Sequence, residues 1–143
     1  MKARIVVATI LMLVPYLVLP GRAQTQAVSI DQLVARIALY PDALIAQILL
    51  SAADPVQVEE FDRWLAANNK ALSGSKLQDA AVKAGFDASL VALALFPQVV
   101  RQMASDLNWT KTLGGTFAID RNLIFASIQK LRRQAQSVGT LKT

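Results

Sequence analysis

The 143-residue chain contains neither cysteine nor histidine. Without cysteine it can form no disulfide, no thiolate nucleophile, no cysteine zinc site and no thioether-linked lipid at its N-terminus. Without histidine it has no imidazole base and no histidine-ligated metal. These two absences exclude catalytic triads and most transition-metal centres, so we expect no metal, no cofactor and no enzyme of those classes.

Charge is also scarce. The sequence has 15 Lys and Arg against 10 Asp and Glu, and three of the basic residues, Lys2, Arg4 and Arg22, lie in the N-terminal segment described next. Without that segment the net charge is +2, whereas nucleic-acid binding needs a dense basic stripe. The one basic cluster, at residues 130–133, ends a predicted helix, where cations match the helix dipole. We therefore predict a solvated helix end there, in preference to a phosphate or anionic-lipid contact, and no nucleic-acid partner.

The first 27 residues have the pattern of an export signal. Lys2 and Arg4 precede an uncharged run over residues 5–19, after which small residues allow cleavage after Ala23 or, alternatively, after Ala27. A membrane-spanning helix needs about 20 apolar residues, and this run is shorter and contains a proline. We predict a signal peptide at residues 1–23, transient membrane contact through it, and a periplasmic or secreted mature protein. The alternative is a retained anchor, which would make the chain a membrane-anchored scaffold.

Residues 24–143 are predicted to form one all-α domain, a bundle of about six short helices. Sustained alternation of apolar and polar residues, the pattern of a strand, is missing, while apolar residues recur at helical spacing. The stretch from Trp109 through Gly114-Gly115 is interpreted as an irregular connection. The first predicted helix follows Ser29 and extends to Ala38, the second runs from Pro41 to about Ala52, the third begins at Asp54-Pro55, and the fourth opens at Ser75 with Gln78. The remaining predicted helices run from Ala88 to Leu95, from Phe96-Pro97 to about Leu107, and from the residue after Asp120 to Gly139.

Two local interactions are expected from spacing alone. Ser29 and Gln32 form a capping-box pattern at the start of the first helix. Glu59 and Arg63, four residues apart, are expected to form an ion pair on the third helix. The second helix is apolar nearly all round, which predicts a central position in the bundle.

One tetrapeptide occurs twice. Ala38-Leu39-Tyr40-Pro41 returns 56 residues later as Ala94-Leu95-Phe96-Pro97, in both cases between two apolar helices. Two copies are fewer than the three or so that a solenoid requires. We favour an aromatic–proline corner used twice independently over an internal duplication.

The segment around the first corner is specific enough to indicate a family. Residues 33–49, LVARIALYPDALIAQIL, are similar to the signature of a bacterial envelope family of unknown function, numbered 3300, and residues 95–99, 103–110 and 128–132 match its pattern too. The resemblance implies export and a helical module, and it implies no activity, catalytic residue or ligand. Family members usually continue into a β-rich part, so we expect this chain to be either a natural short form or a truncated remnant of a longer envelope protein.

Catalysis would have to use the remaining polar groups. The densest acidic cluster contains Asp54, Glu59, Glu60 and Asp62, and a carboxylate-dependent hydrolase needs two acids facing one cleft. Glu59 and Glu60 are adjacent on a helix and point about 100 degrees apart. Asp54 is predicted to be a helix cap and Glu59 a partner of Arg63. We therefore expect no enzyme, with a carboxylate hydrolase as the alternative.

Aromatic residues with a polar edge commonly anchor interfaces. Trp64 is predicted to be core, whereas Tyr40, Asp42, Phe96 and Trp109 are candidates for an interaction surface. The sequence thus favours a non-catalytic envelope module that binds another protein or a cell-wall component.

Overall fold

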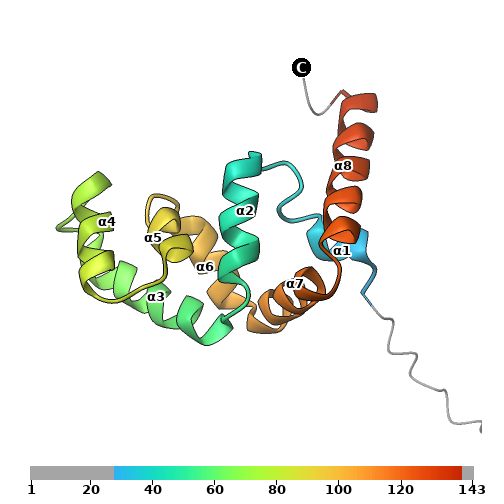
Figure 1. Ribbon diagram of the computed structural model, residues 1–143. Coiled ribbons are helices and arrows are strands. Elements are labelled where there is room, and N and C mark those ends of the chain that lie inside the picture. Colours follow the sequence, from blue (N-terminus) through green and yellow to red (C-terminus); the bar gives the residue numbers. More distant parts are fainter. Residues whose placement is uncertain (1–27, 140–143) are drawn as a thin grey trace, which may run out of the picture.

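A computed structural model describes residues 28–139, which form eight helices and no strand (Figure 1). The all-α prediction is confirmed, but the helices number eight instead of about six. The predicted signal peptide and both possible cleavage sites lie outside the described residues. No helix in the described range is long and apolar enough to cross a membrane. The helices are α1 (Ile30–Val34), α2 (Asp42–Ser51), α3 (Pro55–Asn68), α4 (Gly74–Lys83), α5 (Ala88–Leu93), α6 (Pro97–Ser105), α7 (Leu107–Ile119) and α8 (Arg121–Ser137).

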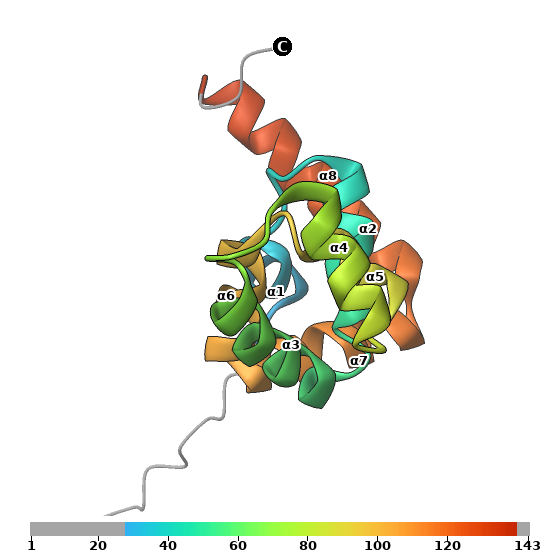
Figure 2. The same cartoon turned by 90° about the vertical axis from the view of Figure 1, so that its left-hand side faces the viewer.

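Helix α2 lies in the middle of the molecule, as its apolar sequence predicts. In Figure 1 it separates α3, α4, α5 and α6 on one side from α1 and α8 on the other. It packs on α5 and α7, while α1 packs on α8 and α3 on α6. Figure 2, turned by 90°, shows α3 and α4 on the near face and α8 extending beyond the other helices. Ile45, Ile48 and Leu49 of α2 are at most 1% exposed and join a single core cluster.

Polar side chains start many of the helices. The Ser29 capping box is present, because Ser29 accepts from the Gln32 amide and the Gln32 side chain accepts from the Ser29 amide. Asp54, Asp106 and Asp120 each accept from the backbone amide three residues later. A side-chain acceptor of this kind satisfies one of the amides that a helix start leaves unpaired.

Several predicted boundaries are wrong. The first helix is shorter than expected, since α1 ends at Val34 and turns carry the chain on to Tyr40. Ser75 does not open α4, because the N-cap position belongs to Ser73. The sixth helix ends at Ser105, two residues before the expected end, because Asp106 is already the cap of the next helix.

The largest error concerns α7, which was expected to be an irregular connection. The helix runs through both glycines although each costs about 1 kcal/mol relative to alanine in a helix interior. A Cβ built on Gly114 would lie 2.1 Å from the backbone oxygen of Ala52, whereas one on Gly115 would have nothing within 4 Å. Gly114 therefore allows α7 to approach the C-terminal end of α2. Tertiary packing outweighs the local preference.

The predicted Glu59–Arg63 ion pair is also wrong. Neither side chain takes part in an ion pair within residues 28–139, and the neighbouring Asp62 instead pairs with Arg101 of α6 at 3.6 Å. Spacing of four residues permits such a pair but stabilises it by only a few tenths of a kcal/mol, about 0.2–0.5. Because an exposed pair of that strength is weak, contacts with other side chains decide whether it forms.

Candidate functional site

The two aromatic–proline corners have the same local structure. In both Ala38–Pro41 and Ala94–Pro97 the alanine is 1% exposed, while the following leucine is about half exposed, at 51% and 48%. The amide of Tyr40 donates to the Ile37 carbonyl at 3.0 Å, and the amide of Phe96 donates to a carbonyl three residues earlier at 2.9 Å. The likeness ends at the proline, because Pro41 is the N-cap of α2 and Pro97 is the first residue of α6.

Because α2 packs on α5, the two corners meet at one apolar cavity of about 340 Å³. Pro41 from the first corner and Phe96 from the second both line it, and Phe96 is 37% exposed. Residues 43–53 and 88–100, which supply the rest of this surface, contain no ionisable side chain. The cavity is lined by Pro41, Ala43, Leu44, Gln47, Ala92 and Phe96.

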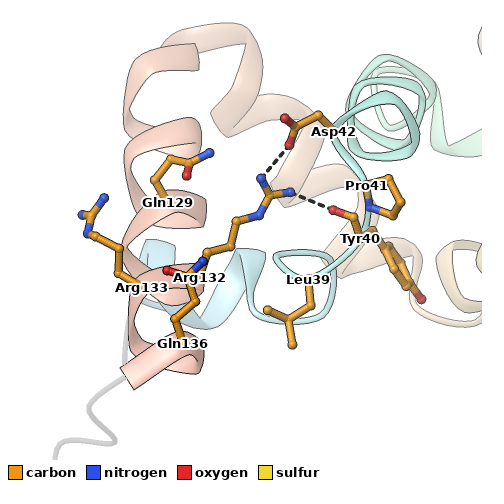
Figure 3. Close-up of a pocket in the computed structure, with 8 residues that line it drawn as sticks. All are labelled: Leu39, Tyr40, Pro41, Asp42, Gln129, Arg132, Arg133 and Gln136. Atoms are coloured by element: carbon orange, nitrogen blue, oxygen red, sulfur yellow. Dashed lines mark hydrogen bonds and ion pairs between the residues drawn. The ribbon is translucent and has the colours of Figure 1, made fainter. Parts of the chain in front are cut away.

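A second concavity, of about 480 Å³, lies on the α8 side of the first corner (Figure 3). Arg132 of α8 reaches across it and donates from Nε to the Ala38 carbonyl at 2.8 Å and from Nη2 to the Tyr40 carbonyl at 2.7 Å. Its Nη1 lies 2.6 Å from Oδ1 of Asp42. The side chain of Arg132 is only 19% exposed, so the guanidinium closes the corner from one side.

Arg132 is the functional-site residue that sequence reasoning missed. We expected a solvated helix end at residues 130–133, and that is wrong for Arg132, whereas Lys130 is exposed and also pairs with Asp31 of α1. The position of Arg132 along the helix could have indicated its burial, because residue 132 follows the buried Ile128 by one helical turn and thus lies on the same face of the helix. Arg133 is exposed, as expected.

Three of the four predicted interaction residues therefore lie together. Tyr40 and Asp42 line the concavity beside α8, and Phe96 lines the apolar cavity on the other side of Pro41. Tyr40 is partly buried and Asp42 is 82% exposed at its side chain.

Trp109 lies elsewhere, against α1. It is only 9% exposed, and its indole Nε1 donates to the Leu33 carbonyl at 2.8 Å. Arg36 lies over its ring at 5.2 Å and pairs with Asp106 at 3.0 Å. The backbone amide of Trp109, followed by the Arg36 guanidinium, lowers the pKa of the Asp106 carboxyl. A further concavity of about 540 Å³ adjoins these residues, but the indole itself chiefly holds α7 to α1.

The acidic cluster on α3 does not converge on one cleft. Asp54 caps the helix, Asp62 pairs with Arg101, and Glu59 and Glu60 are exposed. Within residues 28–139 there is no group of three acidic side chains that could hold a metal ion. Asp54 and Asp62 thus make structural contacts, a helix cap and an ion pair between α3 and α6.

The family described as "Protein of unknown function (DUF3300)" matches residues 26–143. The chain belongs to this family. The chain is also similar to the "Uncharacterized protein YacH" of Escherichia coli (strain K12), with 36% identity over 114 residues, which are 80% of this chain and 18% of YacH. The chain thus spans less than one fifth of the length of that relative. No solved structure matches it significantly.

Proposed function

We propose that this DUF3300 chain is an exported, non-catalytic module of the bacterial envelope that binds another protein or a cell-wall component through the surface around Pro41 and Phe96. The observation that carries the proposal is the apolar cavity that these two residues share. It is formed by segments 43–53 and 88–100, which contain no ionisable side chain, together with Pro41, and the exposed ring of Phe96 lies at its edge. Exposed apolar concavities of this kind are typical of contact sites.

The roles of the carboxylates support a non-catalytic module. Paired-carboxylate hydrolysis needs an acid whose pKa is raised. Within residues 28–139, the two carboxyls with shifted pKa values, Asp31 and Asp106, are both shifted downward, chiefly by hydrogen bonds. Turnover of a glycan or peptide by the purified protein, lost on substitution of Glu59 or Glu60, would overturn this part of the proposal.

The interaction surface can be tested by photocrosslinking in living cells. A photoreactive phenylalanine analogue at position 96 is expected to yield a discrete adduct with one envelope protein or with cell-wall fragments. The same analogue at Val82, which is 60% exposed on α4, is the matched control and should yield none. Identical adducts from both positions, or none from position 96, would contradict the proposal.

Export is tested separately. N-terminal sequencing of the protein recovered from the envelope is expected to begin at Gln24 or Val28, which leaves no anchor. A start at Met1 would instead support the membrane-anchored scaffold. A specific envelope defect on gene deletion, rescued by this short chain, would argue against a functionless remnant.

A further inference from the structure

The concavity beside α8 has one fixed cation and one loosely held anion. Two of the three guanidinium nitrogens of Arg132, Nε and Nη2, donate to the backbone carbonyls of Ala38 and Tyr40, and these hydrogen bonds fix the orientation of the group. The third nitrogen, Nη1, contacts Asp42, whose side chain is 82% exposed. A carboxylate that is mostly in water gains little from a single ion pair, because water competes for both partners. Asp42 is therefore an exchangeable ligand on a preorganised guanidinium.

The rest of the concavity offers further donors. Gln129 and Gln136 line it from α8, and their side chains make no hydrogen bond within residues 28–139 (Figure 3). Arg133, at its edge, adds a second positive charge, although its guanidinium points away from Arg132 in Figure 3. Asp42 is the one acidic side chain in the lining. Leu39, half exposed, supplies an apolar contact on the opposite wall.

We propose that this concavity binds a carboxylate carried by a peptide, which takes the place of Asp42 on Arg132. The guanidinium already accommodates a carboxylate oxygen in that position, on its Nη1, and such a charged contact is stronger than one between neutral groups. Side-chain amides such as those of Gln129 and Gln136 offer both a donor and an acceptor, which is what a peptide backbone requires. The inference deepens the proposed function by stating the chemistry of the partner, and it rests on that function.

Four small probes distinguish the possible sources of the carboxylate. N-acetyl-Ala-Ala carries a free C-terminus, N-acetyl-Glu-Ala-amide carries only a side-chain carboxylate, and N-acetyl-Ala-Ala-amide carries neither. Inorganic phosphate is the fourth. Each is titrated into the purified, isotope-labelled protein while NMR signals of residues 39–42 and of the Arg132 Nε–H are followed. We expect saturable shifts with at least one carboxylate peptide and none with the neutral amide.

The discriminating variant is Asp42→Asn, which removes the internal competitor and leaves Arg132 in place. It should bind the carboxylate peptide about fivefold more tightly, the factor that corresponds to roughly 1 kcal/mol. Gln129→Ala should bind it more weakly. Asp79→Asn, which removes the same negative charge from an exposed position on α4, is the control and should leave the affinity unchanged.

An unchanged or weaker affinity of Asp42→Asn would overturn the inference. Equal binding of the neutral amide, or phosphate binding without carboxylate binding, would do so as well. These results are separable from the proposed function, since photocrosslinking at Phe96 reports on the apolar cavity and the titration reports on Arg132. Adducts at position 96 with no peptide binding would leave the module standing and remove only the carboxylate site.

Discussion

The two sides of the molecule share one apolar core and differ in the contacts that supplement it. On the polar side, which comprises α1, α7 and α8, hydrogen bonds and ion pairs join the helices in addition to their buried apolar side chains. They include Trp109 to Leu33, Ser127 and Lys130 to Asp31, and Arg132 to the first corner. On the aromatic side, which comprises α3, α4 and the loop after α4, the rings of Phe61, Trp64 and Phe86 pack with centroids 4.7–5.8 Å apart.

The shortness of α1 is one reason why the polar side has these additional contacts. Helix α1 has five residues, of which two are buried, whereas α3 has 14 and buries three while stacking a fourth. An isolated helix of five residues does not form in water, because nucleation costs more than one turn returns. The chain therefore holds α1 in place with polar contacts from α7 and α8. Helix α3 buries more apolar side chains and stacks Trp64 on Phe61.

The largest expected effect is on the aromatic side. Phe61→Ala removes a fully buried ring that contacts both Trp64 and Phe86. It should lower the free energy of unfolding by about 3–5 kcal/mol, measured by urea denaturation. Val82→Ala, an exposed position on α4, should change it by no more than about 0.5 kcal/mol. Similar losses in both variants would show that the aromatic cluster is not the stabilising element.

Gly114→Ala tests the contact between α7 of the polar side and α2. The added methyl would lie 2.1 Å from the Ala52 carbonyl oxygen, a backbone atom that cannot move aside alone. We expect a loss of about 3 kcal/mol, at the upper end of overpacking costs. Gly115→Ala, one residue later and in open space, should stabilise the protein by about 0.5–1 kcal/mol, as alanine favours helix. Equal effects from the two variants would contradict the close approach.

On the polar side, Arg132→Met keeps the length of the side chain and removes its donors. The carbonyls of Ala38 and Tyr40 lose their partner, and we expect a loss of about 2 kcal/mol. Chemical denaturation measures it, with Arg133→Met as the control for charge and chain length. If the control destabilises the protein as much, general electrostatics and not the corner is responsible.

The smallest expected effect is that of lowering the pH, which should destabilise the polar side more than the aromatic side. The pKa of Asp31 is lowered by hydrogen bonds from Lys130 and Ser127, and that of Asp106 by the Trp109 amide and Arg36. Both lie below the ordinary value of 3.8, so their stabilisation is fully present above that pH and disappears as the pH falls through the lower folded values.

Amide hydrogen exchange between pH 5 and pH 2 should therefore show α1 and α8 opening before α3. Asp31→Asn should make this dependence on pH weaker, because it removes one of the two carboxyls whose pKa is lowered in the folded protein. Simultaneous opening of both sides would contradict the division of the molecule into two differently stabilised parts.

The sequence predicts well what is local. The capping box at Ser29, the caps at Asp54 and Asp120 and the central position of α2 are all confirmed, because each depends on residues within a few positions. The helical class follows from periodicity for the same reason. The pairing of α2 with α5, and thus the cavity at Pro41 and Phe96, cannot be read from spacing.

The errors arise where distant residues decide the outcome. Gly114 contradicts its own helix propensity because Ala52, 62 positions earlier, leaves no room for a side chain. Arg132 appears solvated in sequence because the carbonyls it binds belong to a corner more than 90 residues away. The hydrogen bond from Trp109 to the Leu33 carbonyl likewise joins residues 76 positions apart. Local patterns carry no information about such contacts.

The two tryptophans of the chain happen to divide between the two sides. Trp64 is half-buried among phenylalanines, and Trp109 is enclosed beneath Arg36 with its N–H bonded to a carbonyl. Replacing either one by phenylalanine leaves a single tryptophan. During unfolding, the variant whose tryptophan emission shifts to the red first reveals which side opens first. The molecule thus contains its own pair of optical reporters, with no dye or label to attach.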